Sequence, residues 1–330
     1  MANLTQLNER IFLIDAHDLG RKARTGSYII KEEKITIVET SASPSVPYIL
    51  DGLKELKIQP SDVEYIIVTH IHLDHAGGAG LLLQHCPNAK VVVHPKGARH
   101  LADPTRLIQG ARAVYGETFD SLFDPILPIP DEKLIVKEDQ EELTIGPNCS
   151  LVFYDSPGHA NHHFSIYDPI SNGIFTGDTI GIYYHELVKD QIELYLPSTS
   201  PNQFRPDKMI EFAEKVQALG VSAIYFGHYG MSTNVNEVYT QLKRWLPIFV
   251  NAGNQSFKIN PTASPTEHKD FIKDIILKEV HAYLDKRKVP RNHDVYEIIE
   301  IDLDICAMGI VDSILKEQKR KRLESETSTN

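Results

Sequence analysis

Short apolar runs alternate with helical patterns along the N-terminal third of the chain. Residues 11–14, 27–30 and 34–39 are rich in β-branched side chains, so we predict them to be strands of one sheet. The chain then continues with a helical spacing at 47–56, a buried strand at 64–68, a second helix at 79–85 and a further strand at 90–93. Alternation of strands and helices is typical of an α/β domain.

The pattern becomes helical at residues 95–124, which we interpret as an insertion followed by a proline-rich linker at 125–131. Strands then resume, most of them separated by glycine, proline or asparagine turn signals, at 134–136, 142–145, 150–154, 163–167 and 173–176. Residues 181–206 have no regular pattern. A helix at 209–219, a strand at 221–226 and a helix at 237–250 complete this part of the chain.

Strand patterns cease beyond residue 251. Helical periods at 267–286 and 304–317 precede a polar tail at 324–330, which we expect to be frayed. We therefore predict two parts: a domain at 1–250 that contains the insertion 95–124, and a mostly helical extension at 251–330.

Composition and charge narrow the classes of function. The chain has 330 residues, 42% of them hydrophobic, which suits a globular core that needs no disulfides. A formal net charge of -11 argues against a nucleic-acid partner, because binding to phosphate backbones depends on clustered Lys and Arg. Three widely spaced cysteines indicate a reducing compartment. No targeting or membrane-spanning pattern is evident, so we expect a cytoplasmic protein that acts on a small molecule.

The most informative motif lies between Thr69 and Gly78, directly after the predicted strand 64–68. Its chemistry-bearing residues are His70, His72, Asp74 and His75. Imidazole nitrogen and carboxylate oxygen are ligands that suit zinc, iron or manganese. The sharp turn after the strand lets His70 and His72 point to one side and Asp74 and His75 to another, so the motif can supply two adjacent ions.

Three further candidates follow other predicted strands, and each comes directly after a glycine. They are His159, Asp178 and His228. A glycine permits a close backbone approach that a Cβ atom would forbid, and so brings the next side chain against a crowded centre. Ligands of a two-metal site must come from separate strand ends, and these positions meet that requirement.

With these seven residues the chain resembles the metallo-β-lactamase superfamily, whose pattern is His-x-His-x-Asp-His, Gly-His, an Asp after Gly and a late Gly-His. The resemblance covers roughly residues 11–250 and does not extend to the C-terminal part. It implies a four-layered αββα sandwich with the metals at one edge between two sheets. It also assigns His70, His72 and His159 to one metal, Asp74, His75 and His228 to the second, and Asp178 to the bridge between them.

Two divalent ions that share Asp178 can hold a water and lower its pKa towards neutrality, which gives a bridging hydroxide nucleophile. We expect zinc, with iron and manganese as alternatives. Asp74 is a candidate proton shuttle, and Tyr183 a candidate hydrogen-bond donor to a leaving group or oxyanion. Lactonases of the family carry a tyrosine three residues after the bridging Asp, where this chain has Gly181, and this departure weakens a lactonase assignment.

We therefore predict a dinuclear metal-dependent hydrolase for a lactone, thioester or phosphoester. The alternative is a mononuclear iron dioxygenase of the persulfide dioxygenase type. A flavodiiron protein is disfavoured, because that pattern has Glu where His72 stands. The sequence does not name the substrate, and a homodimer through the helical insertion is one assembly that it allows.

Supporting residues can also be predicted around the motif. Asp155 and Thr69 are candidates to orient the ligating imidazoles, because each ligating ring needs its second nitrogen held. We interpret His162 and His163 as hydrogen-bonding or surface residues rather than ligands, and His94 and His100 in the same way.

Overall fold

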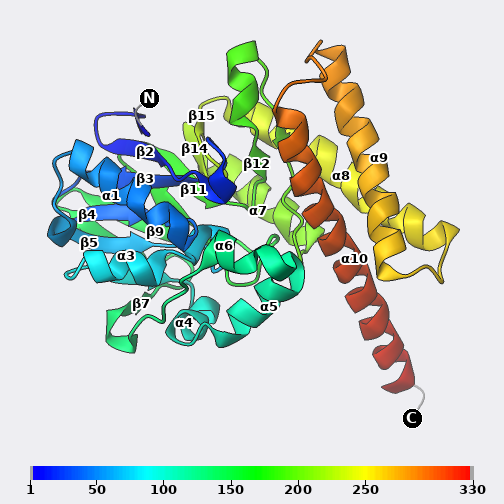
Figure 1. Cartoon of the computed structure of the whole chain (residues 1–330), viewed down its shortest axis with the longest axis horizontal. Coiled ribbons are helices and arrows are strands. Elements are labelled where there is room, and N and C mark those ends of the chain that lie inside the picture. The colour runs from blue at the N-terminus through cyan, green and yellow to red at the C-terminus, as the bar shows by residue number, and fades with distance from the viewer. Residues whose placement is uncertain (1–2, 328–330) are drawn as a thin grey trace. The chain divides into compact units, whose positions relative to one another are not determined.

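The computed structural model describes residues 3–327 (Figure 1). Contacts cluster into two compact units. The first comprises the chain through Ser156 together with His162–Asp178 and Leu219–Val235, and the second comprises Pro157–Asn161, Thr179–Ala218 and the chain from Asn236 onward. The domain boundary that we predict at residue 250 stays a prediction.

A seven-stranded sheet opens the first unit, with its strands in sequence order. Its strands are β1 (Leu4–Gln6), β2 (Ile11–Asp15), β3 (Gly26–Ile30), β4 (Ile35–Val38), β5 (Val63–Ile67), β6 (Lys90–Val93) and β7 (Leu134–Val136). Neighbours are antiparallel from β1 to β4 and parallel from β4 to β7. The predicted strands of this region are therefore confirmed, and β1 is an addition that the pattern did not reveal.

The second sheet of this unit has six strands in the order β15-β14-β11-β10-β9-β8. Their bounds are β8 (Glu142–Gly146), β9 (Cys149–Asp155), β10 (Phe164–Asp168), β11 (Gly173–Gly177), β14 (Ala223–Phe226) and β15 (Met231–Ser232). Alternate residues of β9 are buried, as expected for a strand with one face on a core. Leu151 and Phe153 pack in one apolar cluster with Leu13 and Ile67 of the first sheet, so the main core lies between the two sheets.

Helices cover the other face of the seven-stranded sheet. They are α1 (Val46–Glu55), α3 (Ala79–His85) and α4 (Pro95–Ala102). Ile49 and Leu53 of α1 join Ile66 and Val91 of the sheet in a second apolar cluster. Burial of such side chains contributes roughly 1.5–3 kcal/mol each, so this layer holds the strand ends of the sheet in place.

The predicted insertion is helical. It contains α4, α5 (Thr105–Tyr115) and α6 (Phe119–Phe123). Phe119 and Phe123 are fully buried and pack against Leu73, a residue inside the histidine-rich motif. The insertion therefore supports the segment that carries the candidate ligands.

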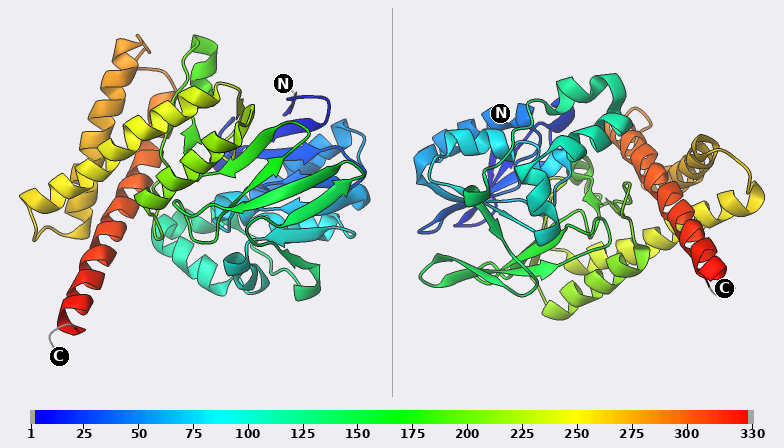
Figure 2. Two further views of the ribbon diagram at one scale, coloured as in Figure 1. Left: turned by 180° about the vertical axis from the view of Figure 1, so that it is seen from behind. Right: turned by 90° about the horizontal axis from the view of Figure 1, so that it is seen from below.

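The second unit is mostly helical (Figure 2). It holds the short strand pair β12 (Ile182–Tyr183) and β13 (Tyr195–Leu196), most of α7 (Pro206–Leu219) and α8 (Val235–Ile259), and all of α9 (Pro265–Lys286) and α10 (Val295–Thr327). A capping box, in which Ser264 and Glu267 bond each other's backbone, begins α9. Trp245 of α8 is fully buried, and its ring packs edge to face with the ring of Tyr283 of α9.

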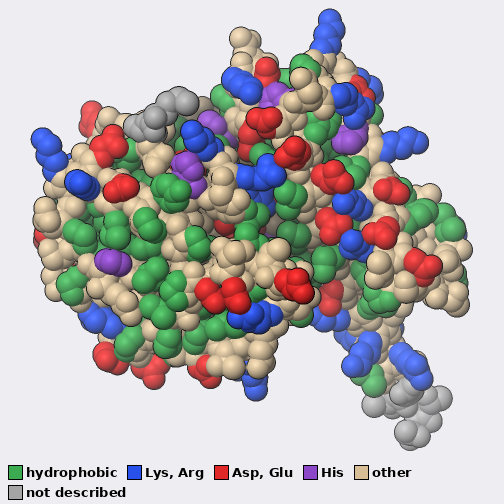
Figure 3. Space-filling model, viewed as in Figure 1, with side chains coloured by type: hydrophobic (Ala, Val, Ile, Leu, Met, Phe, Trp, Pro, Cys, Tyr) green, Lys and Arg blue, Asp and Glu red, His purple; other side chains and the backbone are tan. Residues whose placement is uncertain are grey.

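The last helix differs from its predicted extent. It begins at Val295, earlier than predicted, and it includes residues 324–327, which we expected to be frayed. Ion pairs one turn apart, such as Lys321 with Glu317 and Arg320 with Glu324, support the helical form of this polar end. Its basic side chains are exposed (Figure 3). Residues 328–330 lie outside the described part.

The three cysteines are buried and free; they are Cys86, Cys149 and Cys306. Within residues 3–327, no helix is both long and apolar enough to cross a bilayer.

Candidate metal centre

The histidine-rich motif begins where β5 ends. His72 has an extended backbone (φ −62°, ψ 148°) and stands immediately before the short helix α2 (Leu73–Ala76). This change from extended to helical backbone separates the motif into two parts. The Nε2 nitrogen of His70 lies 3.0 Å from the Nδ1 nitrogen of His72, so these two rings point to a common place as predicted.

Asp74 and His75 lie on α2 and meet residues from two other loops. The Nε2 nitrogen of His75 lies 3.5 Å from an Asp74 oxygen and 3.2 Å from Oδ1 of Asp178. His228 approaches from beyond β14, with its Nε2 nitrogen 3.6 Å from Asp74 and 3.2 Å from Oδ2 of Asp178. The two oxygens of Asp178 thus face two different histidines. Four of the seven predicted ligands converge here within the first unit.

Two of the glycines before these residues are sites of close approach. A Cβ atom on Gly177, whose φ is +47°, would lie 2.5 Å from both Thr69 Oγ1 and His163 Nε2. A Cβ atom on Gly227 would lie 2.6 Å from the Cε1 atom of His75. The glycines therefore permit Asp178 and His228 to approach the motif, as the sequence predicts.

The electrostatics of this group suit a divalent ion. The buried Nε2 atom of His75 has no hydrogen-bond partner among the described residues, although two carboxylates stand close to it. Burial opposes a charge on His75, but Asp178, Asp74 and Glu39 outweigh it and raise its pKa well above the ordinary value. Burial also opposes charge on Asp74, yet His75 and His228 hold its pKa below the usual range. Negative charge on buried carboxylates and an unbonded imidazole nitrogen are what a bound cation would satisfy.

Glu39 is a supporting residue that sequence reasoning missed. It directly follows β4 and is buried, and its Oε2 atom contacts the Nδ1 nitrogen of His75 while its Oε1 atom accepts a hydrogen bond from the backbone of Thr69 at 2.6 Å. Although Glu39 lies within ligand distance of His70 and His75, we interpret it as an orienting group, because it contacts the ring nitrogen that faces away from Asp178. In the sequence, Glu39 is only an acidic residue at the end of a β-branched strand, and that pattern is an ordinary one.

A buried ion pair near the centre was also missed. Asp18 and Arg24 lie on the loop between β2 and β3, with 3.3 Å between the Arg24 Nε atom and Asp18 Oδ2. Burial raises the pKa of Asp18 to about 6. The charge of Asp74 also raises this pKa, whereas Arg24 and His228 lower it. The Gly26 amide, which follows this loop, donates to the carbonyl of Gly227 at 3.1 Å. No motif in the sequence marks this pair.

Of the two residues predicted to orient ligating rings, Thr69 contacts a predicted ligand and Asp155 contacts another histidine. Thr69 Oγ1 lies 3.1 Å from His70 Nδ1, so Thr69 can hold that ring as predicted. The carboxylate of Asp155 instead pairs with His94, which is not a predicted ligand, at 2.9 Å. His163 is a hydrogen-bonding residue, because its Nδ1 atom lies 2.7 Å from the Ser156 hydroxyl and its Nε2 atom accepts from the Asp178 amide.

Two predicted site residues, His159 and Tyr183, belong to the second unit. His159 is buried, with its Nδ1 nitrogen 3.1 Å from the carbonyl of Ser198. Tyr183 is buried and stacks on Tyr195, and burial raises its pKa to about 12. Their places beside the residues of the first unit stay predictions, as does the role of each of the seven residues as a ligand.

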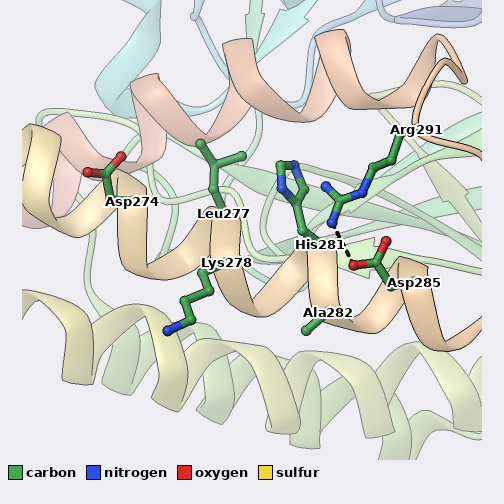
Figure 4. A pocket seen from close by; sticks show the side chains of 7 residues that line it. All are labelled: Asp274, Leu277, Lys278, His281, Ala282, Asp285 and Arg291. Atoms are coloured by element: carbon green, nitrogen blue, oxygen red, sulfur yellow. Dashed lines mark hydrogen bonds and ion pairs between the residues drawn. The ribbon is translucent and has the colours of Figure 1, made fainter.

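A cavity of about 430 Å³ lies against α9 in the second unit (Figure 4). Its lining includes His281 and Arg291, and Arg291 is paired with Asp285 at 2.6 Å. It contains none of the predicted site residues.

Comparison with known proteins settles the family. The model of the Metallo-beta-lactamase superfamily matches residues 24–228, which is more than half of the chain. The chain belongs to this superfamily. A metallo-β-lactamase fold-containing protein of Sulfurisphaera tokodaii is 29% identical over 180 residues, which cover 53% of this chain and 61% of that protein. Glyoxylase B2 of Dictyostelium discoideum is 30% identical over 131 residues, or 39% of this chain and 38% of that protein.

The crystal structure of a metallo-β-lactamase family protein from Thermus thermophilus has the same fold. Its TM-score with this chain is 0.59 at 19% identity, and the match covers 78% of this chain and 89% of that one. The predicted superfamily and its α/β fold with two sheets and C-terminal helices are therefore confirmed. The clusters of buried His, Asp and Glu add candidate metal sites to this fold.

Proposed function

We propose that this superfamily member is a dinuclear metal-dependent hydrolase that cleaves a small ester-like bond in a lactone, thioester or phosphoester. One observation carries the proposal. The two oxygens of Asp178 face His75 and His228 at 3.2 Å each, and Asp74 stands beside the same two rings. A carboxylate that offers its oxygens in two directions among imidazole nitrogens suits a pair of cations.

The residues fit such a pair. His70, His72 and His159 would hold one ion, Asp74, His75 and His228 the other, and Asp178 would serve both. Zinc is the ion that we propose. When bound, the ions supply Lewis-acid activation of a water molecule and of the scissile group.

The chain's own residues have separate tasks in this proposal. Glu39 accepts a hydrogen bond from Nδ1 of His75, which leaves the Nε2 atom on the side of Asp178 and Asp74, where it would bind the ion. The side chain of Asp74 is 24% exposed, against 3% for Asp178, so Asp74 is the carboxylate of this group that can exchange a proton with substrate or solvent. Tyr183 stays protonated at neutral pH, because burial raises its pKa to about 12, and it can donate a hydrogen bond to a leaving group.

The test is elemental analysis of the purified protein, combined with a panel of lactone, thioester and phosphodiester substrates on the same preparation. We expect two divalent ions per chain and hydrolysis of one class. Asp178→Asn should lose metal and lower kcat/KM by at least roughly 10²-fold, while the exposed control Asp131→Asn should leave both unchanged.

Three results would overturn the proposal: a protein without metal, full hydrolysis by Asp178→Asn, or no hydrolysis of any class. A single iron per chain together with oxygen consumption on a persulfide substrate would replace the hydrolase with a dioxygenase.

A further inference from the structure

The buried ring of His159 is held by a segment that follows β13. Its Nδ1 nitrogen lies 3.1 Å from the carbonyl oxygen of Ser198, and its Nε2 nitrogen lies 3.5 Å from the Ser200 hydroxyl. Since a carbonyl can only accept, Nδ1 carries the proton and the lone pair is on Nε2. The position of the Ser198 carbonyl therefore sets both the tautomer and the direction of the ring.

We define the strap as residues 197–202. The strap lies directly on α10. A Cβ atom on Gly309 would come within 1.8 Å of the Thr199 carbonyl oxygen, 2.5 Å of the Ser200 carbonyl carbon and 2.7 Å of the Pro201 nitrogen. All three of these are backbone atoms, which cannot turn aside as a flexible side chain can. Gly309 is thus the position that lets the strap backbone rest against the helix.

Hydrogen bonds fix the strap to the same helix on both sides of Gly309. Thr199 Oγ1 donates to the carbonyl of Cys306 at 3.0 Å, and Lys316 Nζ donates to the carbonyl of Asn202 at 2.6 Å. The Cys306 thiol is buried and lies 3.6 Å from the carbonyl oxygen of Pro197. These contacts attach the strap along several turns of α10.

We propose that α10 is a positioning element for His159. The strap is held on α10 by contacts of Gly309, Cys306 and Thr199. The strap positions the Ser198 carbonyl, and this carbonyl orients the His159 ring so that Nε2 can bind a metal ion. The C-terminal helix, which lies outside the residues matched by the family model, thereby contributes to the metal site. This inference rests on the proposed function in one respect, namely that His159 is a ligand.

The decisive variant is Gly309→Ala, with Gly253→Ala as its matched control. Gly253 lies on α8, and a Cβ atom there would meet only side-chain atoms of α10, Ile310 Cγ2 at 2.5 Å and Ile314 Cδ1 at 2.8 Å. Each change adds one methyl group to a helix. Gly309 belongs to α10, and Gly253 belongs to α8, which packs on α10. Only the change at Gly309 displaces the strap.

Zn²⁺ affinity is measured by competition with a chromogenic chelator, alongside thermal unfolding of the metal-free protein. We expect the native chain to bind two ions. Gly309→Ala should weaken one of the two sites by roughly 10- to 100-fold and leave the other unchanged, whereas Gly253→Ala should keep both sites even if its Tm falls. Native affinity at both sites in Gly309→Ala, or equal loss of affinity in Gly253→Ala, would overturn the inference.

A milder variant covers the case in which Gly309→Ala does not fold. Thr199→Val removes the hydrogen bond to Cys306, and Thr240→Val, which removes an exposed bond to the Asn236 carbonyl within α8, is its control. We expect several-fold weaker binding at one site for Thr199→Val only; equal affinities in the two variants would contradict the inference. A native chain that binds no Zn²⁺ refutes the proposed function itself, whereas a native chain with two ions and an unaffected strap variant refutes only this inference.

Discussion

The carboxylate of Glu39 joins His75 to the backbone of the motif that carries it. One oxygen contacts the Nδ1 nitrogen of His75, and the other accepts the amide proton of Thr69 at 2.6 Å. Glu39 has a left-handed backbone (φ 69°) at the end of β4, which turns its side chain towards the parallel neighbour β5. A single acidic residue thus fixes both the ring and the start of the loop that holds it.

Replacement of this residue should weaken metal binding without unfolding the chain. Glu39→Gln keeps the size of the side chain but loses the charge that favours the Nδ1-protonated tautomer of His75. We expect an affinity for Zn²⁺ lower by roughly 10- to 100-fold, measured by chelator competition. Glu64→Gln on β5 is the control and should bind as the native chain does. Native affinity in Glu39→Gln would show that the contact with His75 has no part in metal binding.

The close approach of Gly227 to His75 yields a second prediction. A methyl group at this position would lie 2.6 Å from the Cε1 atom and 3.0 Å from the Nδ1 atom of the ring, so Gly227→Ala must displace His75 from Glu39 or move the β14 loop. We expect loss of metal at the site of His75 and His228, together with a lower Tm.

Gly110 offers the matched control for that substitution. It lies in α5, and a Cβ atom there has no neighbour within 4 Å. Gly110→Ala should therefore retain metal and gain roughly 0.5–1 kcal/mol in unfolding free energy from helix propensity. A Gly227→Ala protein with its full metal content would mean that the contact is more tolerant than its geometry indicates.

Local patterns predict much of the fold and the four candidate ligands that converge in the first unit, but not the residues that support them. The strand before Thr69 is a continuous apolar run, and the motif after it holds ligands at a spacing that one turn can organise, so both were evident in the chain itself. The glycines before Asp178 and His228 indicate a close approach, because a position without room for a Cβ atom requires glycine. These are features of one short segment each.

The residues that were missed depend on partners far away in sequence. Glu39 and His75 are 36 residues apart, and nothing near Glu39 distinguishes it from an ordinary strand end. The pairing of Asp155 with His94 spans 61 residues, and that of Thr199 with Cys306 spans 107. Side-chain pairs of this kind are set by tertiary packing, which hydrophobic periodicity does not encode. The early start of α10 accompanies burial of its first turns, where Val295, Ile298 and Ile299 are buried.

A last prediction concerns the ion pairs between α9 and α10. Asp304 of α10 accepts from Lys269 at 2.9 Å and lies 3.3 Å from Lys273, both on α9. Burial raises the pKa of Asp304, but the hydrogen bonds from the two lysines outweigh it, so the net pKa lies below the ordinary value. A carboxyl group with a depressed pKa stabilises the folded state above its unfolded pKa of about 3.9, and this contribution is lost as the pH falls through the folded value.

Asp304→Asn should therefore lower Tm at neutral pH and have progressively less effect towards about pH 3. The side chain is 33% exposed, so screening by solvent limits the loss to about 1 kcal/mol or less, a shift of a few degrees at most. Asp270→Asn is the control. Asp270 lies 3.2 Å from the same Lys269, but it is 62% exposed and belongs to α9, as Lys269 does. This change should therefore leave Tm nearly unchanged. Thermal unfolding of both variants across this pH range is the measurement. A difference between Asp304→Asn and the native chain that persists at low pH would show that packing at this position, rather than charge, holds the two helices together.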